Sequence, residues 1–61
     1  MLAAKVTLYD EKDRVIVTDY AYGNTKRTVD AAAGALRRQL EIEHEEMHPG
    51  CNGVISRTVK A

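Results

Sequence analysis

The residues of this chain that are best suited to chemistry lie together in segment 41–48, EIEHEEMH. His44, Glu45 and His48 match the H-E-x-x-H pattern, in which a helix places two imidazoles on one face and the glutamate acts as general base beside zinc. Pro49 follows directly and disfavours helical backbone at His48. The chain has only two histidines, and its 61 residues are too few to enclose a substrate cleft. We therefore expect no zincin-type hydrolase and, more broadly, no enzyme.

The same segment also suits a simple divalent-metal site. Glu41-x-x-His44 and Glu45-x-x-His48 repeat the i,i+3 spacing that carboxylate di-iron bundles use. Cys51 follows three residues after His48, close enough in sequence to join both histidines around zinc. The alternative is an exposed helix end whose histidines are ordinary surface residues. We expect no cofactor by default, with zinc as the candidate ion if these five residues act together.

A helix over residues 28–47 is expected to position this segment. Thr25 or Thr28 can cap its start, and Asp30 is expected in the first turn, where the helix dipole favours negative charge. An apolar stripe at helical spacing gives the helix one core-facing side. The stripe consists of Val29, Ala32, Ala33, Leu36, Leu40 and Met47.

The last turn or two of this helix are expected to project beyond the rest of the fold. Glu43 falls near the centre of the apolar stripe, where a packed helix would bury it. A twenty-residue helix is about 30 Å long, whereas a seven-residue strand spans about 23 Å. Pro49 should end the helix near Met47. Segment 41–48 is therefore predicted to be an exposed tip.

Period-two alternation predicts strands on either side of the helix. Residues 3–9 form a half-buried strand whose even positions, from Leu2 to Leu8, point inward. Residues 10–13, DEKD, are polar turn formers that suit a hairpin connection. Residues 14–22 and 54–60 are predicted to be the second and third strands.

This element order predicts a single α+β domain over residues 1–61, built as β-β-α-β. A right-handed crossover that skips one position places the third strand beside the first. The result is a three-stranded antiparallel sheet of order 2-1-3, with one long helix packed on one face. The sequence alone leaves open whether the third strand pairs with the first or with the second.

The small size of the chain favours a homodimer, because so short a domain buries a marginal core and one cysteine gives no intrachain disulfide. The consecutive β-branched residues 15–17 are typical of a strand covered on both faces. Val15, Val17, Tyr20 and Tyr22 are therefore candidate contacts with another subunit on the far side of the sheet. The alternative is that these valines simply lie exposed.

The charges of the helix point to a second candidate contact. Arg37 and Arg38 precede the glutamates at 41–46, an order that opposes the helix dipole. A second copy running antiparallel would place both arginines against the partner's glutamates. The alternative is a solvated charged face without a partner.

The formal net charge of zero weighs against a dedicated nucleic-acid binder. A nucleic-acid-binding regulator that uses a basic patch is nevertheless an alternative. The patch would consist of Lys26, Arg27, Arg57 and Lys60. The start of the chain does not resemble a signal peptide, and no stretch approaches the length of a transmembrane helix, so we expect a cytoplasmic protein without a membrane partner.

These observations predict a non-enzymatic, homodimeric interaction or regulatory module that acts by protein–protein binding. Its partners would be a second copy of itself and another protein. Metal binding through the helix-end cluster is one alternative, and nucleic-acid binding through the basic patch is the other.

Overall fold

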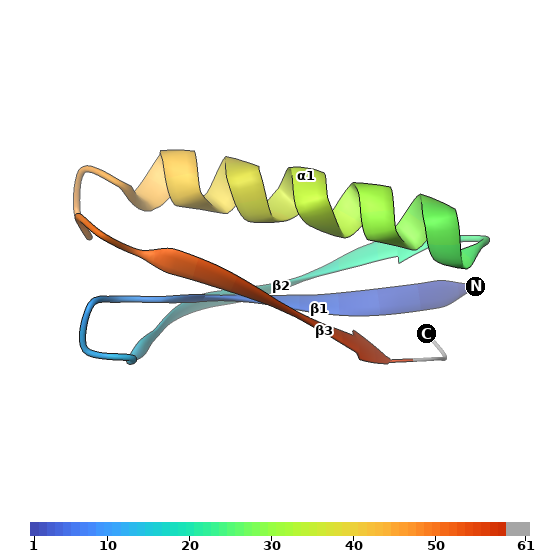
Figure 1. Ribbon diagram of the computed structural model, residues 1–61, viewed down its shortest axis with the longest axis horizontal. Coiled ribbons are helices and arrows are strands. Elements are labelled where there is room, and N and C mark those ends of the chain that lie inside the picture. The colour runs from blue at the N-terminus through green and yellow to red at the C-terminus, as the bar shows by residue number, and fades with distance from the viewer. Residues whose placement is uncertain (59–61) are drawn as a thin grey trace.

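The computed structural model describes residues 1–58, which form three strands and one helix. Strand β1 spans Leu2–Tyr9, β2 spans Val15–Gly23 and β3 spans Asn52–Thr58, while helix α1 spans Lys26–His44. Both strand pairings are antiparallel, and the strand order is β2-β1-β3. Helix α1 runs along one side of the sheet (Figure 1). The predicted fold class and the pairing of the third strand with the first are therefore confirmed.

The central strand β1 divides its side chains between the two faces of the sheet. We call the side covered by α1 the closed face and the opposite side the open face. Val6 and Leu8 point to the closed face and are fully buried. Directly paired residues of neighbouring strands project on the same face. The partners of Val6 and Leu8 in β2 and β3 therefore belong to the closed face, and those of the odd-numbered residues of β1 to the open face.

Small side chains bring α1 close to the closed face. The buried core consists of Ala4, Val6, Leu8, Ala21, Val29, Ala33 and Leu40. Alanine is present in β1, β2 and α1, so the core is built mainly from short aliphatic groups. At Gly23 the strand and the helix lie especially close, because a Cβ atom there would be 2.6 Å from the backbone nitrogen of Val29. The helix can lie this close only because position 23 carries no side chain.

The consecutive β-branched residues 15–17 contain an irregularity in the strand pairing. Leu8 pairs with Val17 and Tyr9 pairs with Val15, so Ile16 is an extra residue in β2. Such a β-bulge shifts the alternation of side chains by one position. Val17 and Ile16 pack against the core, whereas Val15 is 61% exposed. The run thus reflects a bulge, and Val15 and Val17 lie on different faces.

The helix begins at Lys26 and is capped by Thr25. The Thr25 hydroxyl accepts a hydrogen bond from the Thr28 amide at 3.1 Å, which satisfies one of the unpaired donors of the first turn. Contrary to expectation, no acidic residue lies in the first turn. Because the helix starts two residues earlier than predicted, Asp30 lies beyond that turn. Its carboxylate instead lies 2.8 Å from the Arg57 guanidinium of β3.

The α-helix ends at His44, three residues earlier than predicted. One further bond, from the His48 amide to the His44 carbonyl at 2.9 Å, continues the turn before Pro49. The predicted core position of Met47 is wrong: it lies beyond the helix end and is 80% exposed. Glu43 is exposed as predicted, and its carboxylate accepts a hydrogen bond from Gln39 at 2.9 Å.

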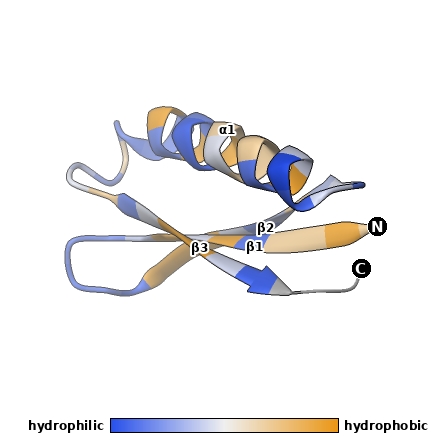
Figure 2. Cartoon of the chain, turned by 45° about the vertical axis from the view of Figure 1, so that its right-hand side comes forward, coloured by the Kyte–Doolittle hydropathy of each residue, from blue (hydrophilic) through white to orange (hydrophobic). Residues whose placement is uncertain are grey.

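Segment 41–48 projects less than the length comparison suggested. Its Glu41 and both histidines are only partly exposed. The hairpin connection after β1 extends toward the loop that follows the helix, so that a Cβ atom on Gly50 would lie 2.8 Å from a carboxylate oxygen of Glu11. Figure 2 shows α1 with hydrophilic and hydrophobic residues around its circumference, and this hairpin connection as mainly hydrophilic.

Candidate functional site

The structure places the predicted metal ligands at the carboxyl end of α1 and in the loop after it. The rings of His44 and His48 have centroids 6.4 Å apart and are tilted by 43°. Cys51 is a free thiol whose Sγ lies 3.8 Å from the Glu41 carbonyl oxygen. Within residues 1–58, no three His, Cys, Asp or Glu side chains gather as a group that could hold a metal ion. Zinc binding therefore stays a prediction that no assembled ligand set supports.

Arg37 makes contacts within the chain, although its side chain remains 43% exposed. Its Nε donates to Glu41 at 2.8 Å, and its Nη2 lies 3.4 Å from the Asn52 side-chain oxygen. The Arg37 side chain crosses β3 at Gly53, where a Cβ atom would lie 2.6 Å from the Arg37 Cγ. These contacts tie the middle of α1 to the start of β3. Of the two predicted interface arginines, Arg38 is exposed and Arg37 is partly buried.

Arg38, Ile42 and Glu45 form a short exposed strip on α1 and the turn after it, which we call the helix strip. Ile42 is 70% exposed. The helix strip borders a recess of about 280 Å³. The recess is lined by Arg38, Glu41, Ile42, Glu45, Gly50 and Cys51. In sequence order the strip presents a positive charge, an apolar group and a negative charge.

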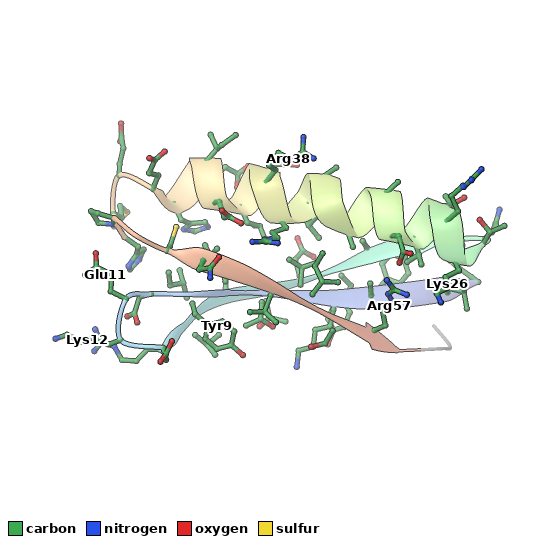
Figure 3. All side chains as sticks on the ribbon, viewed as in Figure 1. Tyr9, Glu11, Lys12, Lys26, Arg38 and Arg57 are labelled. Carbon is green, nitrogen blue, oxygen red and sulfur yellow. The ribbon has the colours of Figure 1, made fainter. Side chains whose placement is uncertain are left out.

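All three aromatic residues of the chain lie on the open face. Tyr22 pairs with Ala3, Tyr20 pairs with Lys5, and Tyr9 is itself an odd-numbered residue of β1. Tyr20 and Tyr22 are 48% and 53% exposed, and Tyr9 is partly buried. Figure 3 shows Tyr9 on the side of the sheet away from α1. The two predicted tyrosine contacts therefore share one surface with each other and with Val15.

The open face is also distinctive in its charge. Its described strand residues are Ala3, Lys5, Thr7, Tyr9, Val15, Thr18, Tyr20, Tyr22, Asn52, Val54 and Ser56. Lys5 is the only charged residue among them, and none is acidic. The only carboxylate within the strands belongs to Asp19, which pairs with Val6 on the closed-face register and accepts a hydrogen bond from the backbone amide of Tyr20 at 2.8 Å. Acidic residues are otherwise confined to α1, its following turn and the hairpin connection.

The residues of the predicted basic patch do not form one surface with the tyrosines. Lys26 and Arg27 lie at the start of α1, and Arg57 pairs with Ala4, which places it on the closed face beside Asp30 (Figure 3). Tyr20 and Tyr22 lie on the opposite face of the sheet. Lys60 lies outside the residues that the structure describes. The sheet therefore separates the described basic residues of the patch from the aromatic residues.

Sequence reasoning overlooked three residues that these surfaces expose. Ile42 was not singled out, although its position four residues after Arg38 and three before Glu45 is a readable helical spacing. Lys5 and Val54 were not assigned to an interface, although alternation along β1 and β3 predicts their faces once the sheet order is known. The sequence thus contained a signal for all three residues, and only those of Lys5 and Val54 required the strand pairing to be interpreted.

No helix within residues 1–58 is both long and apolar enough to cross a membrane. Comparison of the chain with models of known protein families, with curated proteins and with solved structures finds no match.

Proposed function

We propose that this protein is a non-enzymatic interaction module that forms a homodimer through the helix strip of α1. The observation that carries the proposal is the order of Arg38, Ile42 and Glu45, which places a positive, an apolar and a negative group along one line of the helix. A second copy lying antiparallel presents the same groups in the reverse order. The strip is thus complementary to itself, as the isologous interface of a two-fold dimer requires.

The largest favourable contribution to the free energy of association comes from burying Ile42. Covering a large aliphatic side chain contributes about 1.5–3 kcal/mol when burial is complete, and a two-fold dimer covers two copies. The recess beside the strip offers space for the partner's Ile42. Each pairing of Arg38 with the partner's Glu45 adds about 0.2–1 kcal/mol at an exposed site. Since association itself costs several kcal/mol, a weak, concentration-dependent dimer is expected.

The antiparallel dimer also explains the order of charges along the helix. Arg38 precedes Glu45, and this order opposes the dipole of a single helix. Two antiparallel helices place the amino-terminal half of one beside the carboxyl-terminal half of the other, so each charge meets the opposite sign. Raising the salt concentration should weaken such a dimer, because exposed ion pairs are screened.

Charge reversal provides a direct test by sedimentation velocity. Arg38→Glu alone gives a strip with two negative ends, and Glu45→Arg alone gives one with two positive ends. Each variant should be less dimeric than the wild type, whereas an equimolar mixture should form a one-to-one heterodimer. Combining both substitutions in one chain should restore self-association. Arg27→Glu, an exposed reversal outside the strip, is the matched control and should leave the dimer unchanged.

Two results would overturn the proposal. One is a wild-type protein that stays monomeric at concentrations near a millimolar. The other is a pair of single variants that dimerise as well as the wild type, with no preference for each other when mixed. Circular dichroism of each variant separates a failure to associate from a failure to fold.

A further inference from the structure

We infer that the open face of the sheet binds single-stranded nucleic acid, with its bases stacked on Tyr20 and Tyr22 and its phosphates near Lys5. This inference concerns a different surface from the helix strip and does not rest on the proposed dimer. It rests on the segregation of aromatic rings and charge between the two faces of the sheet.

The aromatic residues are available for stacking because the fold does not use them as core. The buried core contains only aliphatic residues, and the rings of Tyr20 and Tyr22 are about half exposed. These two tyrosines are separated by one residue on edge strand β2, which spaces their Cα atoms by about 6.8 Å along the strand. Aromatic side chains on an exposed surface are the platform on which unpaired bases stack, with little dependence on sequence.

The charge of the open face indicates which class of ligand can bind there. Lys5 is exposed and pairs in register with Tyr20 on one side and Ser56 on the other, so its ammonium group lies among the neutral residues of the face. A second copy of the same face would bury Lys5 without supplying a carboxylate, and an unpaired buried charge is costly. The occupant must therefore bring negative charge together with flat apolar groups. Single-stranded nucleic acid has both.

The net charge of zero does not contradict this inference, because the charges are unevenly distributed. The described strand residues of the open face carry no carboxylate, and the acidic residues of α1 lie across the sheet. A single cation neutralises few phosphates, so affinity is expected to be modest and to depend mainly on stacking. The exposed hydroxyls of Thr18 and Ser56 offer additional hydrogen bonds to sugar or phosphate oxygens.

The experiment measures binding of 5′-labelled oligo(dT) and oligo(rU), each about 15 nucleotides long, to the full chain by fluorescence anisotropy at low salt. Both should bind, and a duplex of the same length should bind more weakly because its bases are already stacked. A preference for oligo(rU) would identify RNA, through its 2′-hydroxyls, as the better ligand. The three tyrosines are the only fluorophores of a chain without tryptophan, and all lie on this face. Stacking should therefore quench the intrinsic emission, after correction for oligonucleotide absorption.

Paired substitutions assign the contacts. Tyr20→Ala and Tyr22→Ala should each weaken binding about 5- to 150-fold, whereas the Tyr→Phe variants at both positions keep the ring and should bind as the wild type does. Lys5→Gln should weaken binding and reduce the slope of log affinity against log salt by about 0.7. Lys26→Gln, which removes a charge at the start of α1, is the matched control and should change neither value. The Arg38→Glu variant, which is altered on the other side of the sheet, should bind like the wild type.

Three outcomes would overturn the inference. The first is no binding of either oligonucleotide at low salt. The second is equal binding of single strand and duplex, which indicates charge attraction without stacking. The third is binding of poly-glutamate as strong as that of the oligonucleotides and insensitive to loss of the tyrosine rings, which would identify an acidic protein segment as the occupant. The alanine variants remain interpretable because both tyrosine side chains lie outside the core.

Discussion

The two faces of the sheet share the central strand β1 but differ in the side chains that this strand contributes to them. On the closed face, β1 presents Ala4, Val6 and Leu8 to α1, and all three are fully buried. On the open face the same strand presents Ala3, Lys5, Thr7 and Tyr9, and no other helix or strand of residues 1–58 lies over them (Figure 1). The closed face is stabilised by short aliphatic side chains that allow α1 to pack closely against the sheet. The open face keeps the aromatic rings, the largest apolar groups of the chain, where they contribute least to the core. The tyrosines therefore lie outside the buried core cluster.

The largest loss of stability is expected when a large side chain is removed from the closed face. Leu8→Ala should lower the free energy of unfolding by about 2–5 kcal/mol, because Leu8 is fully buried and its loss leaves a cavity. Domains of this kind have a total stability of only several kcal/mol, so the variant should be largely unfolded or close to it. Urea denaturation followed by circular dichroism measures the change.

The matched substitution on the open face is Val54→Ala. Val54 is 46% exposed and pairs with Thr7, so its truncation leaves no enclosed cavity. A change within about 0.5 kcal/mol is expected, as for most surface substitutions. Similar losses for Leu8→Ala and Val54→Ala would mean that the open face is as tightly packed as the closed face.

Alanine substitutions at two glycines test the same comparison, and they should change the stability of the protein in opposite directions. A Cβ at Gly23 would lie 2.6 Å from the Val29 backbone nitrogen, so Gly23→Ala should push α1 away from the closed face and cost about 1–3 kcal/mol. A Cβ at Gly34 would meet nothing within 4 Å, and alanine favours helix over glycine by about 0.8–1 kcal/mol. Gly34→Ala should therefore raise the melting temperature while Gly23→Ala lowers it. A shift of the same sign in both variants would contradict the close approach at Gly23.

The fold was predictable from the sequence because β1 alternates so regularly. The positions from Leu2 to Leu8 defined the inward face, and chain-crossing rules then favoured the order that the structure has. The β-bulge at Ile16 was not predictable, since three consecutive β-branched residues suit a bulge and a doubly covered strand equally well. Met47 fits the apolar spacing of the helix, yet it belongs to the segment predicted to be exposed, and it is exposed because it lies beyond the end of the helix.

The candidate surfaces were predictable only in part. Tyr20, Tyr22 and Arg38 were identified from the sequence and are exposed in the structure. Arg37 was grouped with Arg38, yet it turns inward to Glu41 and Asn52, because position 53 is a glycine that leaves room for its stem. Such a contact joins residues distant in the chain, so no local pattern reports it.

The smallest predicted change in stability concerns the hairpin connection between β1 and β2. This connection fixes the pairing register of the two strands, and so determines which residues of β2 lie on each face. The Asp10 carboxylate accepts hydrogen bonds from the amides of Lys12 and Arg14, each at 2.9 Å, and its second oxygen lies 3.0 Å from the Arg14 Nε. A shift of one residue in the β1–β2 register would exchange the two faces of β2. The hydrogen bond from the Arg14 amide is the main reason that the pKa of Asp10 is lowered from its ordinary value of 3.8.

Because the pKa of Asp10 is lower in the folded chain, its charged form stabilises the fold at neutral pH. That contribution is fully present above pH 3.8 and is lost as the pH falls through the folded-state pKa. Asp10→Asn keeps the shape of the side chain but removes the charge, so the variant should be less stable than the wild type at neutral pH. The difference in urea midpoint should shrink as the pH is lowered below 3.8. Equal urea midpoints of the two proteins at neutral pH would show that the turn is held by shape alone, and that the charge of Asp10 does not contribute to its stability.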